Sequence, residues 1–202
     1  MIKIEIDPKI KVKKLEEIID LPIVLTVNEF NEKSALKFRE DFNRAINTNQ
    51  RIIPVAIDSY GGECYSLMNM MATIRSSPVP VATIGLSKQI SCGSVLLSCG
   101  TDGHRYIDPF STVMIHDVSL GYHGKIEDVK ASAEEGARIQ KFIFQQMATN
   151  CGKEPDYFLK LIHDHAHSDW YLSSEEAKSH NIINHIRVPN FKVKLSSEIT
   201  FE

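Results

Sequence analysis

Three side chains that could together hydrolyse an acyl bond occur at the ends of predicted strands and helices or between them. Ser91 lies between a glycine-led loop and an apolar segment that begins at Cys92, and His116 ends a short apolar run. Asp169 lies on a polar stretch between two predicted helices. A serine becomes a nucleophile when a histidine accepts its proton and a carboxylate orients that histidine. These residues therefore predict a serine nucleophile, a base and an orienting acid.

Backbone amides suited to an oxyanion accompany the serine. The Cys92 amide follows Ser91 at the predicted start of a helix, where N–H groups have no helical partner and the helix dipole favours negative charge. The paired glycines Gly61 and Gly62 end a neighbouring predicted strand, with no side chain to obstruct their amides. Donors of this kind stabilise the negative oxygen that forms during acyl transfer.

Two alternatives involve nearby residues. Asp117 follows His116 directly and is a rival acid, but adjacent residues on a strand point to opposite faces, which favours Asp169. The alternating histidines of 163–167 could ligate zinc if extended, or two of them could do so on a helix. No cysteine or well-placed fourth ligand accompanies them, so we interpret them as a solvated helix end and expect no metal.

The elements that would position these residues alternate in the first part of the chain. Apolar runs predict strands, and apolar residues spaced by three and four predict helices. The predicted strands are 21–27, 52–57, 81–84 and 112–116; the predicted helices are 35–46, 67–74 and 92–99, with a loop at 85–90. This order indicates βαβ units and a mostly parallel sheet covered on both faces, so the fold class is α/β.

The last third is mostly helical. An amphipathic helix is predicted over 126–150 and another over 153–163; a third begins at a capping box of Ser173 and Glu176, and a strand follows at 182–188. The long helix is apolar on more than one face, which predicts contact with another chain. The glycine-rich segment 121–124 before it suggests backbone that approaches something closely.

Composition narrows the functional classes. The chain has 202 residues and a net charge of −3, which argues against nucleic-acid or membrane-surface binding. No apolar run approaches the ~20 residues of a membrane span, and the first residues do not form a signal peptide. The four cysteines form no CxxC pair, so we expect free thiols in a reducing compartment and a cytoplasmic location. No GxxxxGK[ST] loop for nucleotide is present.

Several motifs together resemble the ClpP family, the proteolytic subunits of ATP-dependent Clp proteases. Ser59-Tyr60-Gly61-Gly62 resembles the family's Ser-Pro-Gly-Gly turn, and Ile90-Ser91-Cys92-Gly93-Ser94 resembles its nucleophile segment. Val113-Met114-Ile115-His116 is similar to its histidine strand. The segment that begins Asp169-Trp170-Tyr171-Leu172-Ser173 is similar to its aspartate segment. The matches keep the family's order over residues 55–188.

The resemblance implies roles and an architecture. Ser91 would be the nucleophile, His116 the base and Asp169 the orienting acid, with the amides of Gly62 and Cys92 as the oxyanion hole. The fold would be ClpP/crotonase-like, with a protruding strand-helix handle. The chain would cleave unfolded polypeptides inside stacked rings, by resemblance a heptamer or tetradecamer. An AAA+ unfoldase would consume the ATP, and this chain would need no cofactor.

The substrate would bind as an added β-strand, because main-chain pairing gives affinity without demanding a particular sequence. The candidate binding residues are Gly61, Glu63, Gly121, Tyr122 and His123. Side-chain selection would then be weak.

Some features depart from the family. Tyr60 replaces the proline of the glycine turn, and Asp117-Val118 replaces the Gln-Pro that follows the histidine. Residues 1–20 are predicted as an N-terminal segment in which 2–6 and 10–13 form a hairpin, either the family's axial loop or an edge strand that pairs elsewhere. Residues 21–188 would form the peptidase domain and 189–202 a C-terminal tail.

Two other functions are compatible with such a fold. A crotonase-like acyl-CoA enzyme also builds an oxyanion hole from a glycine turn and a helix start, but it would not need Ser91, His116 and Asp169 together. A non-catalytic ring subunit would need none of the three. The presence of all three residues favours a serine peptidase.

Overall fold

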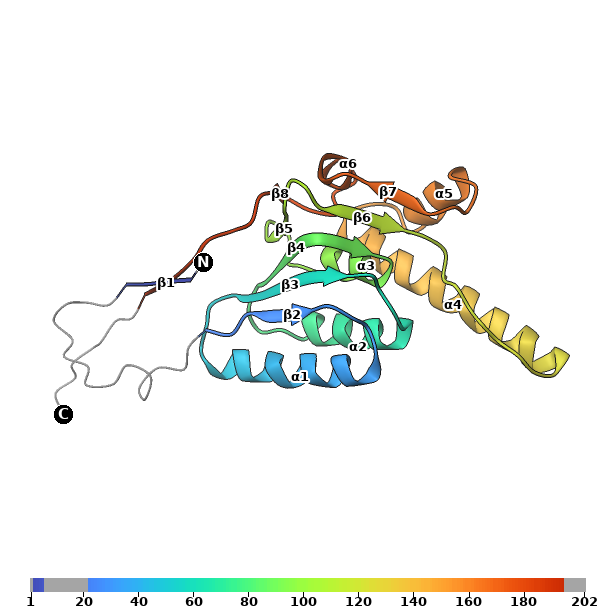
Figure 1. Ribbon diagram of the computed structural model, residues 1–202, viewed down its shortest axis with the longest axis horizontal. Coiled ribbons are helices and arrows are strands. Elements are labelled where there is room, and N and C mark those ends of the chain that lie inside the picture. Colours follow the sequence, from blue (N-terminus) through green and yellow to red (C-terminus); the bar gives the residue numbers. More distant parts are fainter. Residues whose placement is uncertain (1, 6–21, 195–202) are drawn as a thin grey trace.

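The computed structural model of the chain describes residues 2–5 and 22–194. Its main sheet has seven strands (Figure 1). Five follow one another in space: β2 (Leu25–Val27), β3 (Ile53–Ser59), β4 (Val81–Ile90), β5 (Arg105–Ile107) and β8 (His185–Ile186). β6 (Thr112–Ile115) pairs with β4 and with β7 (Trp170–Leu172). Every pairing is parallel except that of β6 with β7.

Six helices connect these strands in the described part of the chain. They are α1 (Glu32–Asn47), α2 (Cys64–Arg75), α3 (Cys92–Ser98), α4 (Ile126–Asn150), α5 (Tyr157–Asp164) and α6 (Ser174–Ser179). Figure 1 shows α1 and α2 packed side by side along the sheet, while the first half of α4 projects beyond it. The predicted α/β class and the extent of the long helix are confirmed. No described helix is both long and apolar enough to cross a membrane.

The core is one apolar cluster that joins the sheet to all six helices. Residues 53–55 and 81–85 are buried at every position. Because successive strand residues point to opposite faces, this burial means that both faces of the central strands are covered. The capping box of Ser173 and Glu176 is present at the start of α6, as expected, and Asn31 forms a similar one with Ser34 at α1.

The prediction of a loop at 85–90 is wrong, because β4 continues to Ile90. The strand changes partner along its length: residues 83–85 pair with β5, and 88–90 pair with β6. Ser87, with a φ of 64°, lies where the partner changes. The buried Gln89 side chain donates hydrogen bonds to the Ile57 and Leu86 carbonyls, so a polar residue is accommodated inside the sheet.

The short strands β5 and β7 were not predicted. The strand predicted at 182–188 is limited to His185–Ile186. Residues 117–125 form no strand, so the projecting handle consists of α4 and an unpaired segment. β1 (Ile2–Glu5) pairs in parallel with β9 (Phe191–Lys194), which corresponds to the alternative of an edge strand pairing elsewhere. The other half of the predicted hairpin, 10–13, lies outside the described residues.

One buried cation holds the ends of two helices together. The Arg105 side chain is 2% exposed, and its guanidinium donates to the carbonyls of Ser98, in the last turn of α3, and Asn150, at the end of α4. It also donates to Asn184 and Asp102. Helix ends leave carbonyls without intrahelical partners and favour positive charge, so Arg105 satisfies both requirements.

We expect Arg105→Met to lower the free energy of unfolding by about 3 kcal/mol, because it leaves buried carbonyls without a donor. Arg44→Met is the control: Arg44 is exposed, and its ion-pair partner among the described residues is Asp41, so its loss should cost less than about 1 kcal/mol. Urea unfolding followed by circular dichroism measures both. Equal small losses would show that Arg105 does not stabilise the helix ends.

Candidate active site

Ser91 occupies a sharp turn between β4 and α3. Its φ of 56° and ψ of −118° lie in a region that costs a non-glycine residue roughly 1–3 kcal/mol. Two elements hold this conformation. The Ser91 amide donates to the Met114 carbonyl on β6 (2.9 Å), and the Ser91 carbonyl accepts from the amide (3.0 Å) and hydroxyl (2.7 Å) of Ser94. The turn presents the Ser91 side chain at the end of the sheet.

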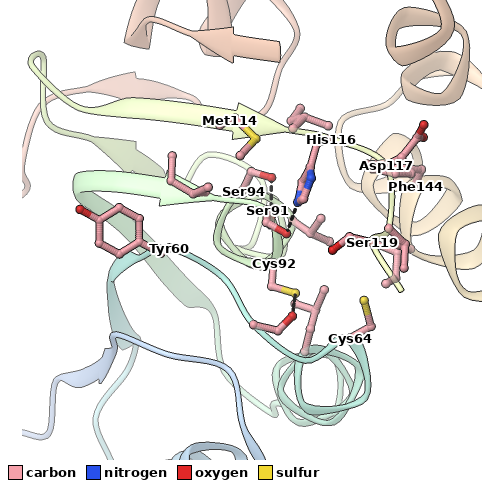
Figure 2. A pocket seen from close by; sticks show the side chains of 17 residues that line it. Tyr60, Cys64, Ser91, Cys92, Ser94, Met114, His116, Asp117, Ser119 and Phe144 are labelled. Carbon is pink, nitrogen blue, oxygen red and sulfur yellow. Dashed lines mark hydrogen bonds between the residues drawn. The ribbon is translucent and has the colours of Figure 1, made fainter. Parts of the chain in front are cut away.

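His116 follows β6 directly and faces Ser91 (Figure 2). The parallel register places Ile90 beside Met114, so the residues after the two strands emerge at the same edge. His116 Nε2 lies 2.8 Å from Ser91 Oγ, a hydrogen-bond distance at which a neutral imidazole can accept the serine proton.

Asp169 lies on the other side of His116. β7 runs antiparallel to β6 with Trp170 beside Ile115, which brings the preceding Asp169 next to His116. Asp169 Oδ1 is 3.8 Å from His116 Nδ1, an ion-pair distance that is longer than a hydrogen bond. The structure therefore brings the three predicted residues together, with the serine–histidine contact formed and the aspartate contact open.

Asp117, the rival acid, is engaged elsewhere. Its Oδ2 lies 2.6 Å from His167 Nδ1, and its Oδ1 accepts a hydrogen bond of 2.7 Å from Gln140 on α4. The Gln140 side chain also accepts from the Val118 amide. His167 stands two residues before Asp169, so this network ties the loop that carries Asp169 to the chain that carries His116. No sequence pattern pointed to Gln140, and the spacing of the histidines suggested His167 only as a possible metal ligand.

The three histidines of 163–167 do not converge on one point, although the ring centroids of His163 and His167 lie 5.3 Å apart. His165 stacks on Trp170, whereas His167 contacts Asp117. Within residues 2–5 and 22–194, no three His, Cys, Asp or Glu side chains gather closely enough to hold a metal ion.

The glycine turn fits tightly against the serine. Gly61 and Gly62 have φ values of 97° and 148°, and a Cβ at Gly61 would lie 2.8 Å from the Ser91 Cβ and 3.3 Å from the Cys92 nitrogen. A Cβ at Gly62 would collide with the Phe30 carbonyl. The Cys92 thiol donates to the Gly62 carbonyl (3.2 Å), so a side-chain contact joins the two segments that carry the predicted oxyanion amides.

A cavity of about 260 Å³ opens beside Ser91. Its lining combines Ser91, His116 and Gly62 with thiols and apolar side chains from α2, α3 and α4. Several of the lining residues carried no signal of a site in the sequence: Cys64, Leu67, Val95, Ser119, Ile143 and Phe144. Leu67, Ile143 and Phe144 belong to helical apolar patterns. Such a pattern shows that a side chain is buried, but not whether it lies in the core or lines a cavity.

The predicted substrate-binding residues are divided between two places. Gly61 adjoins Ser91, and Glu63 follows the glycine turn, where its carboxylate accepts from Ser66. Gly121 and Tyr122 line a separate hollow of about 400 Å³ against α4, and His123 is exposed. A Cβ at Gly121 would meet no atom of the described residues within 4 Å beyond its chain neighbours, whereas one at Gly124 would lie 3.0 Å from the Tyr122 ring, so the close approach within 121–124 is local.

The chain is similar to known proteins over most of its described part. The profile of the family described as Clp protease matches residues 10–190. The sequence is 35% identical over 136 residues to "ATP-dependent Clp protease proteolytic subunit 3" of Nocardia farcinica, covering 66% of this chain and 60% of that protein. It is 32% identical over 134 residues to proteolytic subunit 1 of Salinibacter ruber, covering 66% and 56%. Proteolytic subunit 2 of Corynebacterium efficiens is 31% identical over 136 residues, covering 67% and 66%.

These alignments span 56% to 66% of the relatives' own length. The family profile covers more of this chain than the pairwise alignments do. It includes the glycine turn, the two strands that lead to the candidate serine and histidine, and the loop of Asp169. The mostly parallel sheet with a projecting helix agrees with it. The chain belongs to the Clp protease family.

Proposed function

We propose that this chain is a serine endopeptidase that hydrolyses peptide bonds of unfolded polypeptides. The observation that carries the proposal is the 2.8 Å contact between Ser91 Oγ and His116 Nε2, with Asp169 on the far side of the ring. A serine that was only a helix cap would bond to its own helix, but the Ser91 side chain makes no cap hydrogen bond to α3.

The chemistry uses only this chain's own groups. His116 takes the proton of Ser91 as the hydroxyl oxygen attacks the substrate carbonyl, and the amides of Gly62 and Cys92 stabilise the resulting oxyanion. His116 then gives the proton to the leaving amine, and water repeats the sequence to release the acyl group. Asp169 stabilises the imidazolium, for which its 3.8 Å contact must shorten. No metal or organic cofactor is required by these steps.

The substrate binds in an extended form. The backbone at 61–63, next to the cavity beside Ser91, and the segment at 121–123, at the separate hollow against α4, supply main-chain donors and acceptors. The apolar wall of the cavity, formed by Leu67, Ile143 and Phe144, accepts a side chain. Main-chain pairing gives affinity without selecting a sequence.

Assembly is the second part of the proposal. The first half of α4 and the segment before it expose several large apolar side chains: Leu120, Tyr122, Ile126 and Val129. A monomer would leave this face in water, so we propose that copies of the chain cover it and form rings that enclose the active sites. The proposed partner is an AAA+ unfoldase, which uses ATP and threads polypeptides into the chamber. A cytoplasmic location agrees with this function.

A crotonase-like acyl-CoA enzyme is the alternative from another class, and a non-catalytic ring subunit is a third. Neither requires a serine hydroxyl within hydrogen-bond distance of a histidine.

Ser91→Ala should reduce hydrolysis of fluorogenic peptides roughly 10⁴-fold or more, because it removes the nucleophile. A fluorophosphonate probe should label the original chain at Ser91 and leave the variant unlabelled. Ser76→Ala is the control, since this exposed hydroxyl donates to the Thr73 carbonyl at the end of α2 and does not line the cavity beside Ser91. Peptide hydrolysis that survives Ser91→Ala would refute the proposed function.

Two aspartate variants test which acid supports His116. Asp169→Asn should lower kcat on the order of 10³-fold, because it favours the wrong tautomer of His116. Asp117→Asn should cost much less, since asparagine can keep the contacts to Gln140 and His167. His167→Ala should lower kcat roughly tenfold with little change in KM, because it frees the loop that carries Asp169. A greater loss in Asp117→Asn than in Asp169→Asn would reassign the acid.

Sedimentation should show an oligomer at micromolar concentration. The purified chain should cleave short peptides alone, whereas a stably folded protein should survive until a matching unfoldase and ATP are added. Val129→Glu, which places a charge on the exposed apolar face of α4, should shift the chain towards monomers. An active monomer, or rapid unaided digestion of the folded protein, would contradict the enclosed chamber.

A further inference from the structure

Two cysteines lie beside the proposed nucleophile. Cys64 is the first residue of α2, just after the glycine turn, and Cys92 is the first residue of α3, just after Ser91. Both line the cavity that holds Ser91 and His116. Figure 2 shows their thiols on neighbouring walls of this cavity, close to one another.

The hydrogen-bond partner of the Cys92 thiol depends on the protonation of Cys64. The Cys92 thiol donates to the Gly62 carbonyl while Cys64 is protonated. Once Cys64 has lost its own proton, its sulfur can accept the Cys92 hydrogen instead. This hydrogen bond outweighs burial and lowers the pKa of Cys64 to about 7, while it raises the pKa of Cys92. A substantial share of Cys64 is therefore thiolate near neutral pH.

The other cysteines of the chain differ. Burial raises the pKa of Cys99 and of Cys151 to about 12, and neither lines the cavity beside Ser91. The chain thus contains one partly exposed thiol with a lowered pKa, one adjacent buried thiol and two thiols whose pKa is raised, which serve as controls.

We propose that Cys64 and Cys92 form an oxidisable dithiol, which a small peroxide converts into a disulfide that stops hydrolysis at Ser91. The Cys64 thiolate attacks hydrogen peroxide, and its sulfur becomes a sulfenic acid as hydroxide leaves and is protonated to water. The Cys92 thiol then attacks this sulfur, the S–O bond breaks and a second water leaves. Two thiols and one peroxide give one disulfide and two waters.

The inhibition rests on the proposed function and on the position of Cys92. Its amide is one of the two proposed oxyanion donors, and its thiol ties α3 to the Gly62 carbonyl. A bond to Cys64 removes this thiol–carbonyl contact and pulls the start of α3 towards α2. Small displacements of oxyanion donors lower the rate strongly, because their strength depends on aim and distance. A thiol reductant reverses the change.

The direct test is mass spectrometry of the full chain after dilute hydrogen peroxide, followed by alkylation of the remaining thiols. We expect one disulfide, a Cys64–Cys92 peptide after digestion, and alkylated Cys99 and Cys151 under denaturing conditions. Without peroxide, alkylation of the folded chain should occur first at Cys64 and should accelerate as pH rises through about 7, because the thiolate is the reacting form.

Activity is measured in parallel, each protein against its own untreated rate. Peroxide should lower peptide hydrolysis of the original chain at least tenfold, and dithiothreitol should restore it. Cys64→Ser should resist this loss, and Cys151→Ser, as the matched control, should lose activity as the original does. Peroxide products at Cys64 that never include Cys92 would overturn the dithiol, and a disulfide that leaves hydrolysis unchanged would overturn the inhibition. A chain without any peptidase activity would refute the proposed function while the mass measurement still tests the disulfide.

Discussion

The pairing of β4 with β6 is the constraint on which the site depends. Ile90 lies beside Met114 in a parallel register, and the Ser91 amide continues the pairing by donating to the Met114 carbonyl. A shift of one residue would turn the side chains of β6 to the opposite face and carry His116 away from Ser91. The antiparallel addition of β7 then fixes Asp169 from the other side. Three segments distant in sequence thus meet because of main-chain hydrogen bonds, before any catalytic side chain contributes.

This arrangement stores strain at Ser91, and the surrounding packing compensates for it. The positive φ is held by the Met114 carbonyl on one side and by Ser94 on the other. The glycine turn can approach the strained residue only because Gly61 lacks a side chain: a Cβ there would press against that of Ser91. The replacement of the family's proline by Tyr60 does not disturb this contact, since Gly61 still reaches Ser91 and donates to Ser59.

The sequence predicted what depends on local pattern and missed what depends on partners. The long helix 126–150 and the Ser173–Glu176 capping box follow from spacing alone, and both are confirmed. The extension of β4 to Ile90 could not be predicted, because Gln89 is polar and becomes buried only by bonding to the Ile57 carbonyl of a neighbouring strand. The partners of Asp117 were likewise not predictable, since Gln140 and His167 are distant in sequence and no pattern links either of them to Asp117.

The helix α4 connects the two parts of the molecule that a chambered peptidase would need. Its second half is buried in the core and contributes Gln140 to the network of Asp117 and His167, next to the loop of Asp169. Its first half projects with exposed apolar residues that a neighbouring copy can cover. One helix therefore joins the exposed apolar surface to the side-chain network beside the loop of Asp169.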